Sequence, residues 1–218
     1  MENFLKPTYY FDYQNPTINK YLETLQESSD TLIEKAKKLY LMVRDGFQYN
    51  PYKIVLNPNA LKLSYLITKK EGYCVEKSII LAGLARAIGI PSRLGFANVR
   101  NHLGTEKIER ILGTNVLVFH GYCELYLNDK WVKATPAFNK ELCKKFGVEP
   151  LAFNGYEDSI FQPYNSEGSI FMEYLKDHGT FDDMPFELFK SEFYQYYGHL
   201  INQKVEDMYV TEKFPVNF

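Results

Sequence analysis

The chain has 218 residues, with 25 Lys and Arg side chains against 27 Asp and Glu, a formal net charge of −2 at pH 7. This balance provides no general electrostatic attraction to nucleic acid or to an anionic membrane, so we expect neither as a partner. The length is sufficient for a substantial core, and one domain with elaborations is the default expectation.

The three cysteines are Cys74, Cys123 and Cys143. Their odd number and irregular spacing favour free thiols in a reducing compartment over a disulfide framework. Because no pair has the spacing of a zinc site and no glycine-rich nucleotide motif occurs, we expect no metal and no cofactor. The N-terminus lacks the apolar core of a signal peptide, and no stretch approaches the ~20 apolar residues that span a bilayer. A cytoplasmic protein is therefore expected.

Residues 31–46 are predicted to form an amphipathic helix. Thr31 and Glu34 have the spacing of a capping box, and apolar residues follow at helical intervals. A second, shorter helix is expected over residues 59–68, leading into Gly72. We assign residues 1–48 to an N-terminal helical part that braces the elements after it.

A further helix is predicted to begin at Cys74, because the apolar run of residues 78–88 follows directly. Unpaired backbone N–H groups and the positive end of the helix dipole favour thiolate at such a position, and a nearby imidazolium lowers the thiol pKa further. Cys74 is therefore a candidate nucleophile. The alternative is a buried structural cysteine.

Between a strand expected near residues 93–99 and the next strand lies a polar connection, residues 100–113. Loops that join strands beside a catalytic site often shape the cleft. We interpret Lys107, Glu109 and Arg110 as a solvated face.

Residues 116–127 and 131–136 are predicted to form a β-hairpin, because β-branched and aromatic residues flank a polar turn and Pro136 ends the second strand. Strict alternation along the first strand directs His120 to a face that keeps some polarity and Cys123 to the opposite, apolar face. His120 is therefore a candidate catalytic residue, and Cys123 is interpreted as a small apolar filler.

From residue 49 to residue 139 the chain resembles the transglutaminase-like superfamily, papain-related enzymes with a cysteine at a helix start followed by a histidine and an acid on adjacent strands. The matching segments, in order, are residues 72–74, 84–93, 120–126, 131–132 and 135–136. In that family the third block usually reads His-x-Trp-x-Glu-Val-Tyr and the last ends in Asp-Pro. Here Tyr122 stands for the tryptophan and Thr135 for the aspartate. The resemblance implies an α+β fold with the cysteine at the N-terminus of a central helix packed on an antiparallel sheet.

The resemblance also implies a catalytic set of Cys74, His120 and Thr135. In a Cys–His pair the sulfur attacks a carbonyl carbon, and the imidazole takes the thiol proton and later gives it to the leaving group. The third group orients the ring, and papain-like proteases use a neutral asparagine for this, so a charge is not obligatory. The Thr135 hydroxyl can accept a hydrogen bond from the imidazole, although a plain β-strand role is an equal alternative.

Other residues are candidates for the orienting role. Asn139 lies a few residues beyond the strand end, and Asp129 lies in the turn. Glu124 is separated from His120 by roughly 13 Å along an extended strand, so we interpret it as an ordinary exposed or cross-strand-paired carboxylate.

An oxyanion needs preorganised donors, and the backbone N–H of Cys74 is the natural first one. In the family a second donor comes from a segment ahead of the cysteine, which here contains Gln48, Tyr49 and Asn50. Each of the three can donate a side-chain hydrogen bond. The alternative is that Tyr49 packs in the core and Asn50 makes a turn.

Residues 140–218 form an aromatic-rich extension that the resemblance does not cover, after the core of residues 49–139. Ten of the sixteen Phe residues lie from Phe146 onward, and a helix is expected over residues 185–197. We favour an extension packed on the core; the alternatives are a lid over the cleft or a surface for oligomerisation. Because no linker separates it, we treat residues 1–218 as one domain.

Two functions follow from these observations. The first is a cysteine-dependent acyl-transfer enzyme, a protease, amidase or transglutaminase-like protein acting on a peptide, protein or small amide substrate through a thioester. We favour hydrolysis over crosslinking, although fold alone does not choose between them. The second is a weak or inactive relative that binds a peptide or ligand in the cleft, because the usual acid is absent.

Overall fold

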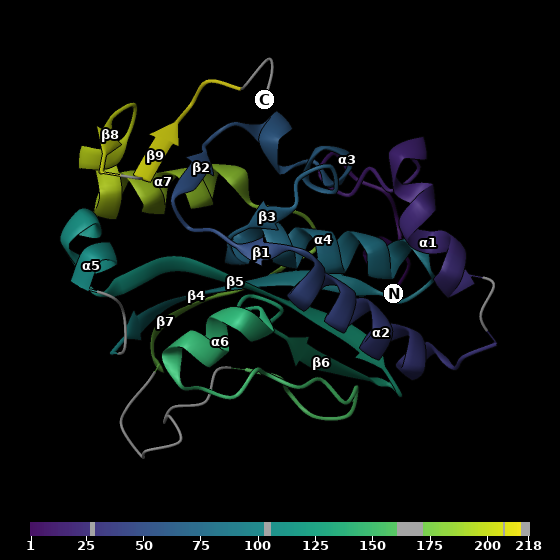
Figure 1. The fold of residues 1–218 in the computed structure, drawn as a ribbon. Helices are drawn as coiled ribbons and strands as arrows, with labels where there is room; N and C mark the ends of the chain where they lie inside the picture. Colours follow the sequence, from purple (N-terminus) through teal and green to yellow (C-terminus); the bar gives the residue numbers. More distant parts are fainter. Residues whose placement is uncertain (27–28, 103–105, 161–171, 207, 215–218) are drawn as a thin grey trace.

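The computed structural model describes residues 1–26, 29–102, 106–160, 172–206 and 208–214. At its centre lies a four-stranded antiparallel sheet in the order β6-β5-β4-β7 (Figure 1). The bounds of the strands are Ser92–Asn101 (β4), Val116–Leu127 (β5), Lys130–Ala134 (β6) and Met172–Phe181 (β7). Helix α4, Cys74–Ala87, lies along one face of the sheet (Figure 1). The expected α+β class is confirmed.

Helix α2, Leu32–Gly46, begins at the predicted capping box. The Thr31 hydroxyl accepts a hydrogen bond from the Glu34 N–H at 3.3 Å, and the Glu34 carboxylate accepts one from the Thr31 N–H at 2.8 Å. The buried face of α2 packs against α4, so the prediction for this helix is confirmed.

The prediction of a single helix over residues 59–68 is wrong. The chain instead forms a 3-10 turn, Pro58–Leu61 (η3), and a short helix, Leu63–Leu66 (α3). Lys62 between them is extended, with φ −69° and ψ 137°. One extended residue breaks the helical hydrogen-bond pattern, and both pieces still bury apolar side chains.

The buried Lys77 side chain joins α4 to the end of α2. Its ammonium donates hydrogen bonds to the carbonyl oxygens of Arg44, at 2.8 Å, and Phe47, at 2.7 Å. Carbonyls at a helix C-terminus lack partners within the helix and favour a positive charge. Burial nevertheless dominates and lowers the pKa of Lys77 to about 7.

Two small sheets connect distant parts of the chain. One pairs β1 with β3 in parallel, and the other has the order β2-β9-β8, so the C-terminal region is joined to the segment that follows β1. The strands are Gln48–Tyr49 (β1), Lys53–Val55 (β2), Glu71–Gly72 (β3), Lys204–Val205 (β8) and Met208–Thr211 (β9). Further helical segments are Glu2–Phe4 (η1), Pro16–Ile18 (η2), Asn19–Gln26 (α1), Lys140–Phe146 (α6) and Gly198–Leu200 (η4).

The connection between β4 and β5 differs from the expectation of a polar loop. It contains a short helix, Glu106–Leu112 (α5), whose Ile111 and Leu112 are buried. Ile108 and Leu112 are four residues apart and so lie on one side of this helix. The charged residues between them made the segment resemble a polar loop.

The predicted hairpin of β5 and β6 is confirmed. Asn128 and Asp129 form its turn with φ 48° and 59°, and Cys123 lies opposite Ala134 with no exposed surface. Alternation along β5 is not strict, however. Phe119 has φ 56°, and the β4–β5 register shifts between Ala97 and Val99. This bulge lies directly before His120.

Helix α7, Phe186–Tyr197, confirms the helix expected in the aromatic extension. Its Phe189, Phe193 and Tyr197 are buried in the core. The Tyr197 hydroxyl accepts a hydrogen bond from the Val118 N–H at 3.0 Å and donates one to the Val116 carbonyl at 2.5 Å. Thus α7 satisfies backbone groups of β5 beyond the end of β6.

None of the helices in the described ranges has the length and apolar character needed to cross a bilayer.

Replacing Tyr197 by Phe should lower the free energy of unfolding by about 1–3 kcal/mol, because the Val118 N–H and the Val116 carbonyl lose their partner. Urea denaturation measures this change. Tyr196→Phe is the matched control, since Tyr196 is 39% exposed on the same helix and should change stability by less than ~0.5 kcal/mol. Equal losses in the two variants would contradict the bridging role.

Lys77 should make a contribution to the stability of the fold that rises with pH. Its pKa of about 7 in the folded protein lies below the ordinary lysine value, so the unfolded chain binds more protons between the two values. The contribution of Lys77 to the unfolding free energy, taken as the difference between the wild type and Lys77→Met, should therefore increase by about 2 kcal/mol from pH 7 to pH 9. Lys77→Met should remove this increase, whereas Lys37→Met, at an exposed position on α2, should retain it. A rise that survives in Lys77→Met would assign it to another group.

Candidate active site around Cys74

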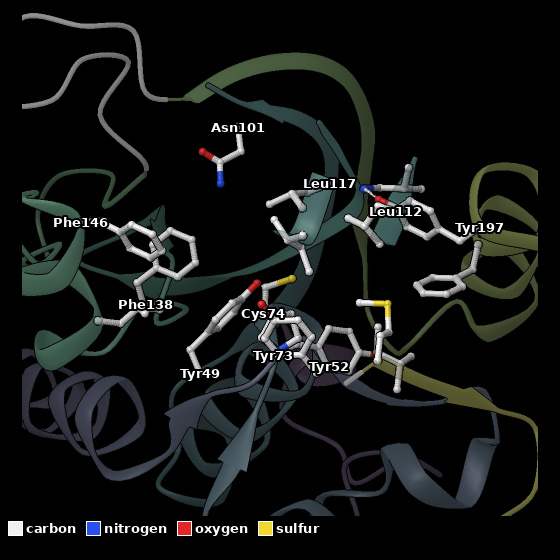
Figure 2. Close-up of a pocket in the computed structure, with 17 residues that line it drawn as sticks. Tyr49, Tyr52, Tyr73, Cys74, Asn101, Leu112, Leu117, Phe138, Phe146 and Tyr197 are labelled. Carbon is white, nitrogen blue, oxygen red and sulfur yellow. Dashed lines mark hydrogen bonds between the residues drawn. The ribbon is translucent and has the colours of Figure 1, made fainter. Parts of the chain in front are cut away.

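Cys74 is the first residue of α4, as predicted from the sequence. The preceding residue, Tyr73, is extended, and its N–H donates to the Glu76 carboxylate at 3.3 Å. All residues of α4 through Arg86 are buried, so the helix is the central one of the fold. The Cys74 side chain is 8% exposed and lies at a pocket (Figure 2).

Hydrogen-bond donors surround the Cys74 sulfur. The backbone N–H groups of Gly121, Val75 and Cys74 itself, together with the Tyr49 hydroxyl, each lower the pKa of the thiol. Burial acts in the opposite direction and is larger, so the pKa of Cys74 is raised to about 11. Cys74 is therefore a thiol at neutral pH. The thiolate expected at the helix start is therefore disfavoured, because burial outweighs the hydrogen-bond donors.

Tyr49 is the oxyanion-hole candidate that meets Cys74. Figure 2 shows its hydroxyl beside the sulfur, and burial raises the pKa of Tyr49 well above its ordinary value. Its N–H donates to the Asn139 side-chain oxygen at 3.0 Å, and its ring packs edge-to-face on Phe138 with centroids 4.8 Å apart. These contacts fix both the backbone and the ring of Tyr49, and therefore the position of its hydroxyl.

The other two oxyanion-hole candidates point elsewhere. Gln48 is exposed. The Asn50 amide donates to the Glu71 carboxylate at 2.8 Å, and its side-chain oxygen accepts from the Tyr52 N–H at 2.9 Å. Asn50 therefore forms a turn contact, as in the alternative interpretation of that residue.

His120 reaches the site through its backbone. The Gly121 N–H at the sulfur belongs to the peptide bond that joins His120 to Gly121. A Cβ atom on Gly121 would lie 2.9 Å from the Val75 Cα atom, so β5 approaches the first turn of α4 closely at the residue after His120. Burial lowers the pKa of His120 to about 4. The pairing of the Cys74 thiol with the imidazole stays a prediction.

Phe119 gives β5 an unusual course beside this histidine. A non-glycine residue with φ 56° costs of order 1–3 kcal/mol, and such strain is concentrated at functional sites. The Asn98 side-chain oxygen accepts the Phe119 N–H at 2.9 Å in place of a regular strand partner. Val118 lines the pocket, whereas His120 is not among its described lining residues.

Thr135 follows the last residue of β6, and its carbonyl accepts a hydrogen bond from the Tyr40 hydroxyl at 3.0 Å. Continuing the β5–β6 register by one residue places Thr135 opposite Tyr122 and diagonal to His120. Its hydroxyl is buried and has no hydrogen-bond partner among the described residues. A hydroxyl in this state is available to an imidazole.

The alternative orienting residues have other contacts. The Asn139 side-chain oxygen accepts from the Tyr49 N–H, and its amide donates to Glu141 at 2.7 Å, so this side chain holds Tyr49. Asp129 lies in the hairpin turn, at the end of β5 away from His120. Glu124 accepts from the Arg93 guanidinium at 2.6 Å across β4 and β5, which confirms the cross-strand pair.

The open pocket beside Cys74 comprises about 950 Å³ of space, which includes bulk solvent at its mouth. Its lining includes residues that the motif-based prediction missed: Ile108 and Leu112 from α5, Phe193 and Tyr197 from α7, and Met208 from β9. The apolar residues spaced four apart in α5 and α7 were the available signal. Spacing marks a buried face, but it does not identify what that face covers.

Comparison with known proteins gives the family. A model of the transglutaminase-like superfamily matches residues 19–136. A proposed cysteine protease from Cytophaga hutchinsonii is 13% identical with a TM-score of 0.48, covering 82% of this chain and 53% of that one. A proposed protease from Parabacteroides distasonis is 14% identical with a TM-score of 0.40, covering 61% and 26%.

This chain therefore spans about half the length of the Cytophaga protein. No curated protein sequence matches it. The family match covers more than half of the chain and contains Cys74, His120 and Thr135, so the protein belongs to the transglutaminase-like superfamily.

Proposed function

We propose that this protein is a cysteine acyl-transfer enzyme in which Cys74 attacks the carbonyl carbon of an amide or peptide bond. The observation that carries the proposal is the position of Cys74: it begins a buried helix, lines a pocket, and has the Tyr49 hydroxyl beside its sulfur (Figure 2). The backbone N–H groups of Gly121, Val75 and Cys74 also act to lower the pKa of its thiol. A cysteine that only fills the core requires no such donors. Preorganised donors of this kind stabilise negative charge on a sulfur or on an oxyanion.

His120 acts in this proposal as a general base. Because burial keeps both the thiol and the imidazole neutral, the proton moves from sulfur to imidazole as the sulfur–carbon bond forms. The imidazolium then gives that proton to the leaving amine when the carbon–nitrogen bond breaks. Water attacks the thioester in the second half, releasing the acid and restoring the thiol.

Thr135 is proposed to orient the imidazole. Its buried hydroxyl lacks a partner among the described residues and lies next to β5 in the extended register. A neutral acceptor holds the ring but stabilises imidazolium less than a carboxylate does. The low pKa of His120 agrees with the absence of an acid at this position.

We favour hydrolysis over transfer to an amine acceptor. The described lining of the pocket includes no carboxylate that could attract a cationic amine. The three cysteines are all free, which supports action in a reducing compartment such as the cytoplasm. A binding module is the second candidate, favoured by the neutral thiol and imidazole and by Thr135 in place of an acid.

Acetylation by p-nitrophenyl acetate tests the nucleophile and the base. The wild type should release p-nitrophenolate in a burst and carry one acetyl group on Cys74, detected by peptide mass spectrometry. Cys74→Ala should lose the burst, and His120→Ala should slow it roughly 100- to 10,000-fold. Cys143→Ala is the matched control at another buried cysteine and should retain it.

The pH profile of the same reaction gives an independent check on His120. Because its pKa is lowered to about 4, the base is neutral over most of the accessible range. The acetylation rate should stay high as the pH falls from 7 to 5 and decline near pH 4. A wild-type rate retained in Cys74→Ala or in His120→Ala would favour the binding module.

Thr135 is tested by an isosteric change and by restoration of the acid. Thr135→Val should lower the acetylation rate by roughly 5- to 10-fold, the worth of one hydrogen bond. Thr135→Asp should preserve or raise the rate and shift the acid limb to higher pH, because a carboxylate favours imidazolium. An unchanged rate in Thr135→Val would move the orienting role to Asn139 or to another residue.

A further inference from the structure

We propose that the C-terminal region makes the pocket selective for an uncharged acyl group with an aromatic or branched aliphatic side chain. This inference rests on the proposed function, because it assigns the substrate group that lies beside the carbonyl attacked by Cys74. It concerns the part of the chain after residue 136, which the family match does not include.

The chemistry of the described lining excludes a charged group. It contains aromatic and aliphatic side chains, with Asn101 as its one amide, and no Asp, Glu, Lys, Arg or His. The Tyr49 hydroxyl lies beside the sulfur (Figure 2), and the Tyr197 hydroxyl bonds to the β5 backbone. The Tyr73 hydroxyl also lines the pocket and has no hydrogen-bond partner among the described residues, so the pocket offers a neutral polar group but no counter-ion. A buried ion would lose its hydration without a counter-ion, whereas an apolar group gains about 25 cal/mol per Å² of surface removed from water.

The position of the pocket indicates which part of a substrate it receives. Figure 2 shows Cys74 between two groups of rings, with Phe138 and Phe146 on one side and Tyr197 on the other. A substrate whose carbonyl reaches the sulfur therefore places its adjacent side chain between these rings. We assign these rings to the acyl side of the scissile bond, which remains attached to Cys74 in the thioester.

Phe193, Tyr197 and Met208 form the C-terminal wall of the pocket, and contacts with neighbouring elements hold this wall in place. The Phe193 and Tyr197 rings pack edge-to-face with centroids 4.9 Å apart, and Tyr197 bonds to β5 through its hydroxyl. Met208 begins β9, and the next residue, Tyr209, donates its N–H to the Tyr52 carbonyl at 2.7 Å. The wall is consequently a preformed surface, as in most small-molecule sites.

Leu142 offers a way to invert the selectivity. It lies on α6, lines the pocket and is only partly buried, so a lysine at this position can keep its ammonium hydrated in part while facing the pocket. Leu188 on α7 is 37% exposed and lies outside the described lining, so Leu188→Lys is the matched control.

Calorimetric titration of Cys74→Ala with four small amides tests the proposal. Phenylpropanamide and isocaproamide should bind at least ~10-fold more tightly than succinamate and γ-aminobutyramide, which carry a carboxylate and an ammonium group. Adding Leu142→Lys should weaken the binding of phenylpropanamide by about 10-fold and strengthen the binding of succinamate. Adding Leu188→Lys should change neither affinity. Thermal unfolding checks that each variant is folded.

Equal or tighter binding of the charged amides to Cys74→Ala would overturn the proposal, as would the absence of binding by all four. These outcomes require no folded Leu142→Lys protein. Cys74→Ala forms no thioester, so a failure of acyl transfer leaves the binding order intact. Conversely, acetylation of Cys74 without a preference among the amides would remove the selectivity and retain the proposed enzyme.

Discussion

The site depends on the close approach of the first turn of α4 to β5 at Gly121. Only a residue without a side chain fits there, because a Cβ atom would lie 2.9 Å from the Val75 Cα atom and 3.3 Å from the Cys74 carbonyl oxygen. This approach brings the N–H between His120 and Gly121 to the Cys74 sulfur. One backbone contact therefore fixes the helix, the strand and the candidate nucleophile relative to one another.

The same approach explains the protonation of the site. Packing α4 on the sheet removes the sulfur from water, and the resulting desolvation is larger than the effect of the four donors. The imidazole is buried in the same way, and its pKa falls to about 4. In the proposed reaction these donors act when charge develops during attack, which is where preorganised dipoles contribute to catalysis.

Contacts that stabilise the fold also shape the pocket. Lys77 fixes the end of α2 and the start of β1, so it bears on the position of Tyr49, and Asn139 holds the Tyr49 N–H from the other side. Tyr197 both satisfies the β5 backbone and lines the pocket. Because the C-terminal region serves both purposes, its aromatic residues are part of the core and part of the site.

The sequence by itself determined the capping box of α2, the helix that begins at Cys74, the hairpin that carries His120, and α7. These features depend on interactions between residues a few positions apart, which capping chemistry and periodicity describe directly. The family motifs predict Cys74, His120 and Thr135 as the catalytic set, because their order along the chain is a property of the sequence.

Only the tertiary structure decided the rest. The extended Lys62 split one predicted helix, α5 formed in a segment expected to be a polar loop, and Phe119 interrupted the alternation of β5. Contacts with distant residues distinguish Tyr49 from the other oxyanion-hole candidates. Asn139 holds the Tyr49 N–H, whereas the Asn50 amide bonds to Glu71. The protonation of Cys74 and the apolar wall also depend on burial by residues far away in the chain, and no local pattern encodes which surfaces will meet.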